Sequence, residues 1–300
     1  MKQKVALVLG SGGARGIAHI GAIRELLDNG YTISSISGTS MGALIGGVYA
    51  AGKLDEFEAW LNKLNKKDVF SLMDFTLSKS GILKASRALL EIQKFIPDQQ
   101  IEDLPINYSA IAADLKQNKE IIITQGSLFE AIRASIAIPM VLTPVKRSGS
   151  FMVDGGILNP VPTNRVVRHE NDLLVAINVT ASIPGVVTEN IDQNFIEKLL
   201  HFRFSMQNSA NNEVNMGYIN LIVKTSRTMI AQIAKLTLEL SPPDMLVEVS
   251  SDACGTFEFY KASELIEIGR NAMSNVLKKN NLLNKKEVEN TFDISEISLL

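Results

Sequence analysis

Short apolar runs rich in Val and Ile alternate along the chain with longer stretches whose apolar residues recur every three or four positions. The run at 5–9 precedes a stretch at 17–29, where one helical face carries Ile20, Ile23, Leu26 and Leu27. Gly30 then ends this helix. Alternating short strands and amphipathic helices predict parallel pairing through right-handed crossovers.

The same alternation continues through most of the chain. A second strand is expected at 33–37, and the helix opened by Ser40 contains Gly42, Gly46 and Gly47, which let it lie close to the sheet. A closing helix is expected at about 262–278. Further strands are predicted at 108–113, 120–124, 150–153, 173–179, 219–224 and 245–249. This pattern indicates the α/β class, as a three-layer α/β/α sandwich with a mainly parallel central sheet.

One domain over residues 1–280 accounts for this pattern, because the sequence has no internal repeat, low-complexity segment or linker. Residues 54–105 interrupt the alternation, are mainly helical by period and carry an apolar patch at 70–75. We interpret this segment either as a helical subdomain packed on the core or as a cap-like insertion over a site. Residues 281–300 form a polar C-terminal tail that we expect to fray.

Composition excludes several classes of protein. The net charge is −2 and no basic stripe is present, which argues against a nucleic-acid partner. The single cysteine, Cys254, cannot form an intramolecular disulfide, and we expect a buried thiol. The apolar run after Lys4 stops at Gly10, which indicates a strand rather than a signal peptide. No stretch reaches the about 18 apolar residues of a membrane span. A cytoplasmic protein is expected.

The candidate catalytic groups lie in two glycine-rich turns, GSGGARG at 10–16 and GTSMG at 38–42. The second has glycines two positions either side of Ser40, as in a nucleophile elbow that pushes a serine hydroxyl out of a sheet. The first offers backbone N–H groups without side chains to block approach. A nucleophile and an oxyanion site are what acyl transfer needs most, so the pair predicts a serine hydrolase.

The partner of Ser40 is sought among three histidines and one aspartate. His19 is expected as a packed or hydrogen-bonded helix residue, His169 lies in a charged, solvated stretch, and His201 lies in an apolar helix. Asp154 differs, because it ends a predicted strand and precedes a Gly-Gly turn. Strand ends are where open α/β sheets place their sites.

The two glycine turns and the Asp-Gly-Gly at 154–156, in this order, resemble the three signatures of the patatin-like phospholipases. ASIAIP at 134–139 and NPVP at 159–162 are also similar to that family. The resemblance covers residues 5–162 well and the remainder loosely. It implies a patatin-like fold, a lipid or acyl-ester substrate met in the cytoplasm or at a membrane surface, and no metal or cofactor.

The resemblance also implies roles for single residues. Ser40 would be the nucleophile and Asp154 the base of a dyad without histidine. Gly12 and Gly13 would donate N–H groups to the oxyanion. Arg15 is placed with this oxyanion hole, because a cation at a helix N-terminus is electrostatically unfavourable unless an anion lies nearby. That anion is Asp154, a substrate phosphate or the oxyanion, unless Arg15 forms a salt bridge elsewhere.

The predicted activity is hydrolysis of carboxylic esters of phospholipids, lysophospholipids or related acyl lipids through an acyl-enzyme. An α/β-hydrolase triad of Ser40, Asp154 and either His169 or His201 is one alternative, since the order in the chain permits it. A non-catalytic lipid-binding regulatory module is another. A dinucleotide site is disfavoured, because Arg15 stands where its third glycine belongs.

Overall fold

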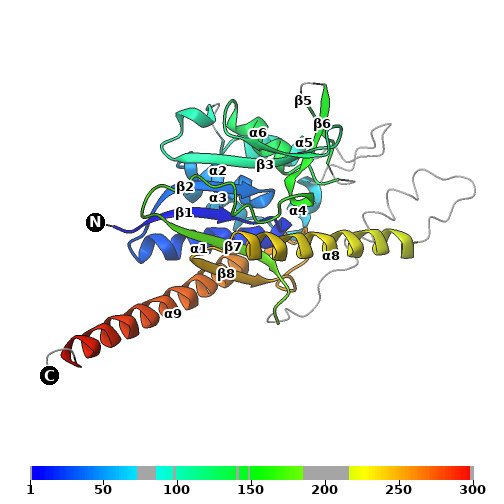
Figure 1. The fold of residues 1–300 in the computed structure, drawn as a ribbon. Helices are drawn as coiled ribbons and strands as arrows, with labels where there is room; N and C mark the ends of the chain where they lie inside the picture. Colours follow the sequence, from blue (N-terminus) through cyan, green and yellow to red (C-terminus); the bar gives the residue numbers. More distant parts are fainter. Residues whose placement is uncertain are drawn as a thin grey trace, which may run out of the picture.

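A single sheet forms the centre of the protein. The computed structural model describes residues 2–72, 86–96, 99–139, 142–147, 149–184 and 216–297. Within these ranges eight strands follow the order β5-β6-β3-β2-β1-β7-β8, with β4 paired to β3 off this path (Figure 1). The strands are β1 (Lys4–Leu9), β2 (Thr32–Thr39), β3 (Asn107–Asp114), β4 (Lys119–Ile123), β5 (Val145–Arg147), β6 (Ser150–Asp154), β7 (Leu173–Ala181) and β8 (Met245–Ser250).

The sheet is parallel at its centre and antiparallel toward one edge. β1 pairs in parallel with β2 and β7, and the β2–β3 and β7–β8 pairs are parallel too. The β3–β4, β3–β6 and β5–β6 pairs are antiparallel. The predicted class, a mainly parallel sheet between helical layers, is therefore confirmed.

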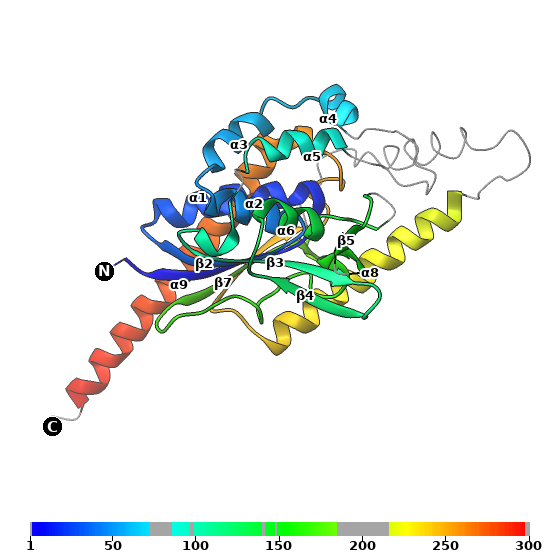
Figure 2. The same ribbon diagram turned by 90° about the horizontal axis from the view of Figure 1, so that it is seen from above.

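Helices cover both faces of the sheet. Figure 2 shows α1, α2 and α6 on one face and α8 on the other. The α-helices are α1 (Ala18–Asp28), α2 (Met41–Ala50), α3 (Leu54–Leu61), α4 (Lys66–Leu72), α5 (Ser86–Gln93), α6 (Leu128–Ser135), α8 (Met216–Leu240) and α9 (Ala262–Ile297). Short 3-10 helices are η1 (Gly13–Ile17), η2 (Ile101–Asp103), η3 (Gly155–Ile157) and η4 (Phe259–Lys261). Across the described ranges, no helix combines the length and apolar character that a bilayer crossing needs.

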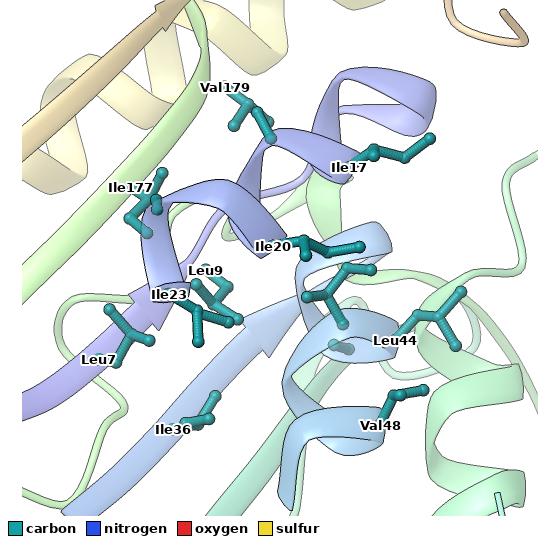
Figure 3. Packing of buried hydrophobic residues seen from close by; sticks show 14 of the residues in the cluster. Leu7, Leu9, Ile17, Ile20, Ile23, Ile36, Leu44, Val48, Ile177 and Val179 are labelled. Atoms are coloured by element: carbon teal, nitrogen blue, oxygen red, sulfur yellow. The ribbon is translucent and has the colours of Figure 1, made fainter. Parts of the chain in front are cut away.

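The alternation of side chains along β1 divides the core in two. Leu7 and Leu9 face the larger cluster, where they pack with Ile20 and Ile23 of α1 (Figure 3). Ala6 and Val8 point to the opposite face and pack in a smaller cluster that includes Ala234 of α8. β1 is buried on both faces for this reason, which explains its unbroken apolar sequence.

Helices α1 and α9 touch backbone to backbone. A Cβ atom on Gly21 would lie 1.8 Å from the Ile266 carbonyl oxygen, and one on Gly269 would lie 1.8 Å from the Ala18 carbonyl oxygen. Only glycine fits at either position without moving the helices apart.

Three features differ from the sequence-based expectation. Residues 219–224 were expected as a strand, and this was wrong, because they lie inside α8. The closing helix α9 continues past 278 to Ile297. α6 and the short β5 were not expected. Gly30 adopts φ +83° just after α1, as expected for the end of that helix.

The segment 54–105 is helical where it is described. α3, α4, α5 and η2 lie in it, and its Phe57, Trp60 and Phe95 rings contact one another, tilted or edge-on, at centroid distances of 5.4–5.5 Å. These rings pack against the larger core cluster. Residues 73–75 of the expected apolar patch lie outside the described residues.

Candidate active site

Ser40 occupies a tight turn between β2 and α2. Its backbone has φ 57° and ψ −122°, a left-handed conformation that costs a residue with a Cβ about 1–3 kcal/mol. The turn has no room for side chains at the flanking glycines, since a Cβ on Gly42 would lie 2.0 Å from the Leu9 carbonyl oxygen. This geometry is that of a nucleophile elbow.

Ser135 holds the elbow from α6. The Ser40 amide donates to Ser135 Oγ at 2.9 Å, and Ser135 Oγ donates to the Ile111 carbonyl at 2.6 Å. The strained backbone of Ser40 is thereby tied to strand β3. Sequence reasoning assigned no role to Ser135, although it noted the stretch 134–139 that contains it.

The structure brings Ser40 and Asp154 together. Asp154 is the last residue of β6, and Ser40 Oγ donates to Asp154 Oδ2 at 2.5 Å. The Gly156 amide donates to Asp154 Oδ1 at 2.7 Å and fixes the carboxyl from its other side. Ser40 is 4% exposed and Asp154 6% exposed. The two side chains form a buried, hydrogen-bonded pair.

Burial changes the basicity of this pair. Desolvation raises the pKa of Asp154 from 3.8 to about 6, against the opposing effect of the hydrogen bonds from Ser40 and Gly156. The carboxylate is therefore a stronger base than an ordinary aspartate, and it remains ionised at neutral pH.

The glycine loop lies beside the pair. Gly10, Ser11 and Ala14 have their amides bonded to the carbonyls of Ile177, Pro160 and Thr256. The amides of Gly12 and Gly13 donate to no acceptor in the part of the chain that is described, and both glycines line the same cavity as Ser40. Gly13 has φ +57°, and its missing Cβ would lie 2.6 Å from the Thr256 carbonyl oxygen.

Arg15 points to the loop that follows β8. It is 7% exposed, and its Nη1 donates to the Cys254 carbonyl at 2.9 Å and to the Ser251 carbonyl at 3.3 Å. Burial lowers its pKa. Its observed partners are thus carbonyl dipoles, and it forms no ion pair with Asp154. Cys254 is a buried free thiol, as expected.

Neither described histidine lies at the site. His19 is fully buried in α1, where its Nε2 hydrogen-bonds the Gly10 carbonyl at 2.8 Å, and burial lowers its pKa to about 4. His169 is exposed, and its Nε2 lies 3.2 Å from the amide of Asn107. His201 lies outside the described residues.

A cavity of about 1190 Å³ opens over Ser40 and Asp154. Its opposite wall comes from α8 and from the loop 251–257 after β8. Sequence reasoning missed both elements, because neither has a motif. The described residues of 54–105 contribute nothing to its lining.

Comparisons with known proteins identify sequence relatives of this chain. The sequence profile of the patatin-like phospholipases matches residues 7–167. An uncharacterized NTE family protein of Mycobacterium tuberculosis strain H37Rv is 34% identical over 89% of each chain. The lysophospholipase NTE1 of Yarrowia lipolytica is 29% identical over 66% of this chain and 14% of its own. The crystal structure of VipD from Legionella pneumophila aligns with 93% of this chain and 67% of its own at 15% identity, with a TM-score of 0.47.

Proposed function

The chain belongs to the patatin-like phospholipase family of lipid acyl hydrolases, and from this premise we propose that it cleaves carboxylic esters of phospholipids, lysophospholipids or related acyl lipids through a Ser40–Asp154 dyad. The observation that carries the proposal is the hydrogen bond from Ser40 Oγ to Asp154 Oδ2 at 2.5 Å, at the floor of a large cavity.

The dyad geometry supports a two-step reaction. Asp154 takes the Ser40 proton as Oγ attacks the ester carbonyl, and then passes it to the leaving alcohol. Water, deprotonated by the same carboxylate, then attacks the acyl carbonyl, and Ser40 Oγ leaves with the proton that Asp154 returns to it. The free amides of Gly12 and Gly13 would bind the oxyanion formed in each step, and one such donor is worth roughly a hundredfold in rate.

The cavity suits an acyl chain. Its apolar lining comes from several elements around the dyad, chiefly Ile138, Ile157, Ile230, Leu238 and Leu246. Burying a methylene of the substrate here would stabilise the complex by about 0.8 kcal/mol. The surface of this cavity is mostly apolar, which is the usual form of a lipid site.

We infer that the protein meets its substrate at a membrane surface, as a peripheral protein on the cytoplasmic side. α8 carries an exposed apolar stripe, Met229, Leu236 and Leu240, on the face of the helix turned away from its cavity residues. An exposed apolar helix face of this kind favours binding to a lipid surface.

A fluorophosphonate probe tests the dyad directly. The expected adduct maps to Ser40, forms equally in EDTA, and is absent in Ser40→Ala. Asp154→Asn should label slowly and lose ester turnover by orders of magnitude. An adduct on another serine, or near-normal turnover in folded Asp154→Asn, would contradict the proposal.

The same assay separates the two alternatives. A triad requires a histidine, so His169→Gln or His201→Gln would lose activity as completely as Ser40→Ala. A non-catalytic module would bind lipid without labelling. We expect both histidine variants to keep most of the wild-type kcat/KM.

A further inference from the structure

Two arginines from distant parts of the chain meet beside the candidate active site. Arg227 of α8 donates from Nη2 to Thr256 Oγ1 at 2.6 Å, and Arg15 donates from Nη1 to the Cys254 carbonyl. Cys254 and Thr256 belong to the loop 251–257, so the two guanidinium groups flank one loop. They are close enough that Arg227 lowers the pKa of Arg15 by charge repulsion.

The two arginines differ in what they offer to a ligand. Both line the cavity, but Arg15 is buried against two carbonyls, whereas Arg227 is exposed. A guanidinium has five N–H donors, and in the described residues only the bond to Thr256 engages those of Arg227. Lys224, one helical turn earlier, lines the same cavity. No carboxylate of the described chain ion-pairs with Arg227 or Lys224.

Other charged groups face this cavity. Glu239 is paired with Lys235 at 3.9 Å, and Asp154 is bonded to Ser40. Asp252 attracts Arg15, and Glu248 lies within β8. Arg15, Arg227 and Lys224 are therefore the cations of this cavity with no acid of the described chain at ion-pair distance, and of these Arg15 is buried against carbonyls.

Thr256 connects Arg227 to the place where the ester would react. The Thr256 carbonyl accepts the Ala14 amide at 2.8 Å, and its oxygen lies 2.6 Å from where a Cβ on Gly13 would be. The glycerol of a phospholipid separates the acyl carbonyl from the phosphate by only a short run of atoms. Along α8, the cationic residues Lys224 and Arg227 precede the apolar Ile230 and Ala231, and all four line the cavity.

We propose that Arg227, with Lys224, binds the phosphate of a lipid headgroup while the acyl chain lies against the apolar part of α8. The site then prefers phosphate-bearing acyl esters to neutral ones. This inference rests on the proposed function, since it assigns the substrate of the same dyad.

The test compares two substrates with the same acyl chain, 1-acyl-lysophosphatidylcholine and 1-monoacylglycerol. Arg227→Gln should raise KM for the phospholipid about tenfold or more, because it removes a charge-assisted hydrogen bond to phosphate. KM for the monoacylglycerol should change by less than about twofold. Lys235→Gln is the matched control, since it removes a cation from the same cavity that is already paired with Glu239.

A purely structural role for Arg227 would give a different pattern. Thr256→Val breaks the bond between Arg227 and the loop but keeps the charge. If Arg227→Gln and Thr256→Val lower kcat equally for both substrates, Arg227 acts by positioning the glycine loop, and the proposal is overturned. Equal KM changes for both substrates in Arg227→Gln overturn it as well.

Binding to Ser40→Ala separates this proposal from the proposed function. Soluble dihexanoyl phosphatidylcholine is titrated into Ser40→Ala and into the double variant with Arg227→Gln. Loss of binding on removal of Arg227 supports the headgroup site even if the wild type hydrolyses no ester. Unchanged binding overturns it. Inorganic phosphate that binds as tightly as the lipid would identify a site for a free anion and would overturn the headgroup assignment.

Discussion

Burial of the Asp154 carboxyl has a cost for the fold as well as a benefit for catalysis. The pKa of this group is about 6 in the folded protein and 3.8 in the reference state, so the folded protein holds the proton more tightly. The free energy of unfolding therefore falls as pH rises from about 4 through about 6, because the unfolded chain releases this proton first.

This linkage predicts that Asp154→Asn is more stable than the wild type at pH 8. The gain is up to about 3 kcal/mol, shrinks below pH 6 and disappears near pH 4. Urea unfolding at pH 8 and pH 4.5 measures it, with Ser40→Ala as the control that keeps the carboxyl buried. A variant less stable than the wild type at pH 8 would contradict the link between burial and basicity.

The same ionisation should govern activity. Asp154 accepts a proton only when ionised, so kcat/KM should rise with pH and level off above an inflection near pH 6. A soluble short-chain ester gives the profile without effects of lipid aggregation. His169→Gln should keep the inflection, because His169 is exposed and does not line the cavity. Its disappearance in that variant would assign the inflection to the histidine.

At the level of elements, the contact between α1 and α9 depends on two glycines. Gly269→Ala places a methyl group 1.8 Å from the Ala18 carbonyl oxygen and forces the helices apart. We expect a loss of about 1–3 kcal/mol or more in the free energy of unfolding.

Gly30→Ala is the matched control for that measurement. Nothing lies within 4 Å of its added Cβ, so only its φ of +83° is unfavourable, at about 1 kcal/mol. If thermal or urea unfolding finds Gly269→Ala no less stable than Gly30→Ala, the helices are not in backbone contact.

The parallel strands could be predicted because strands buried on both faces have continuous apolar sequences, as β1 and β7 do. The prediction of a strand at 219–224 was wrong because of the same kind of pattern. Leu221, Ile222 and Val223 form an apolar run too short to distinguish a strand from the 25-residue helix α8.

Some residues of the site could be predicted from the sequence, and others could not. Ser40, Asp154 and the glycine loop could be predicted, because each sits in a turn whose own residues define its geometry. Arg227 and Thr256 could not be, because only tertiary packing brings α8 and the loop 251–257 to the glycine loop. The contacts of the Arg15 side chain could not be predicted either, because its carbonyl partners lie more than 230 residues away in the sequence.

At the scale of the whole molecule, two parts of the chain line the cavity, and we expect them to have different roles. Ser40, Asp154 and the glycine loop lie within residues 7–167, which the family profile matches, whereas α8 and the loop 251–257 lie beyond it. Substrate preference should therefore change through residues of α8 without loss of the dyad.

Ile230→Ala tests this division. It removes apolar surface from the cavity, so kcat/KM for a long-chain ester should fall roughly tenfold, equivalent to ~1–2 kcal/mol, while an acetyl ester is nearly unaffected. Leu221→Ala is the control, because Leu221 is exposed on the same helix and does not line the cavity. Equal losses across a series of chain lengths would show that Ile230 does not touch the acyl chain.

The position of β1 between β2 and β7 affects how the chain folds during synthesis. β1 pairs with β2 on one side and with β7 on the other, so its second edge stays unpaired during synthesis until residues 173–181 have been made. Until then the nascent chain exposes an apolar strand edge, which is a template for association with other chains. A fragment of residues 1–167 would carry both Ser40 and Asp154 and still aggregate, because its most buried strand would become an edge.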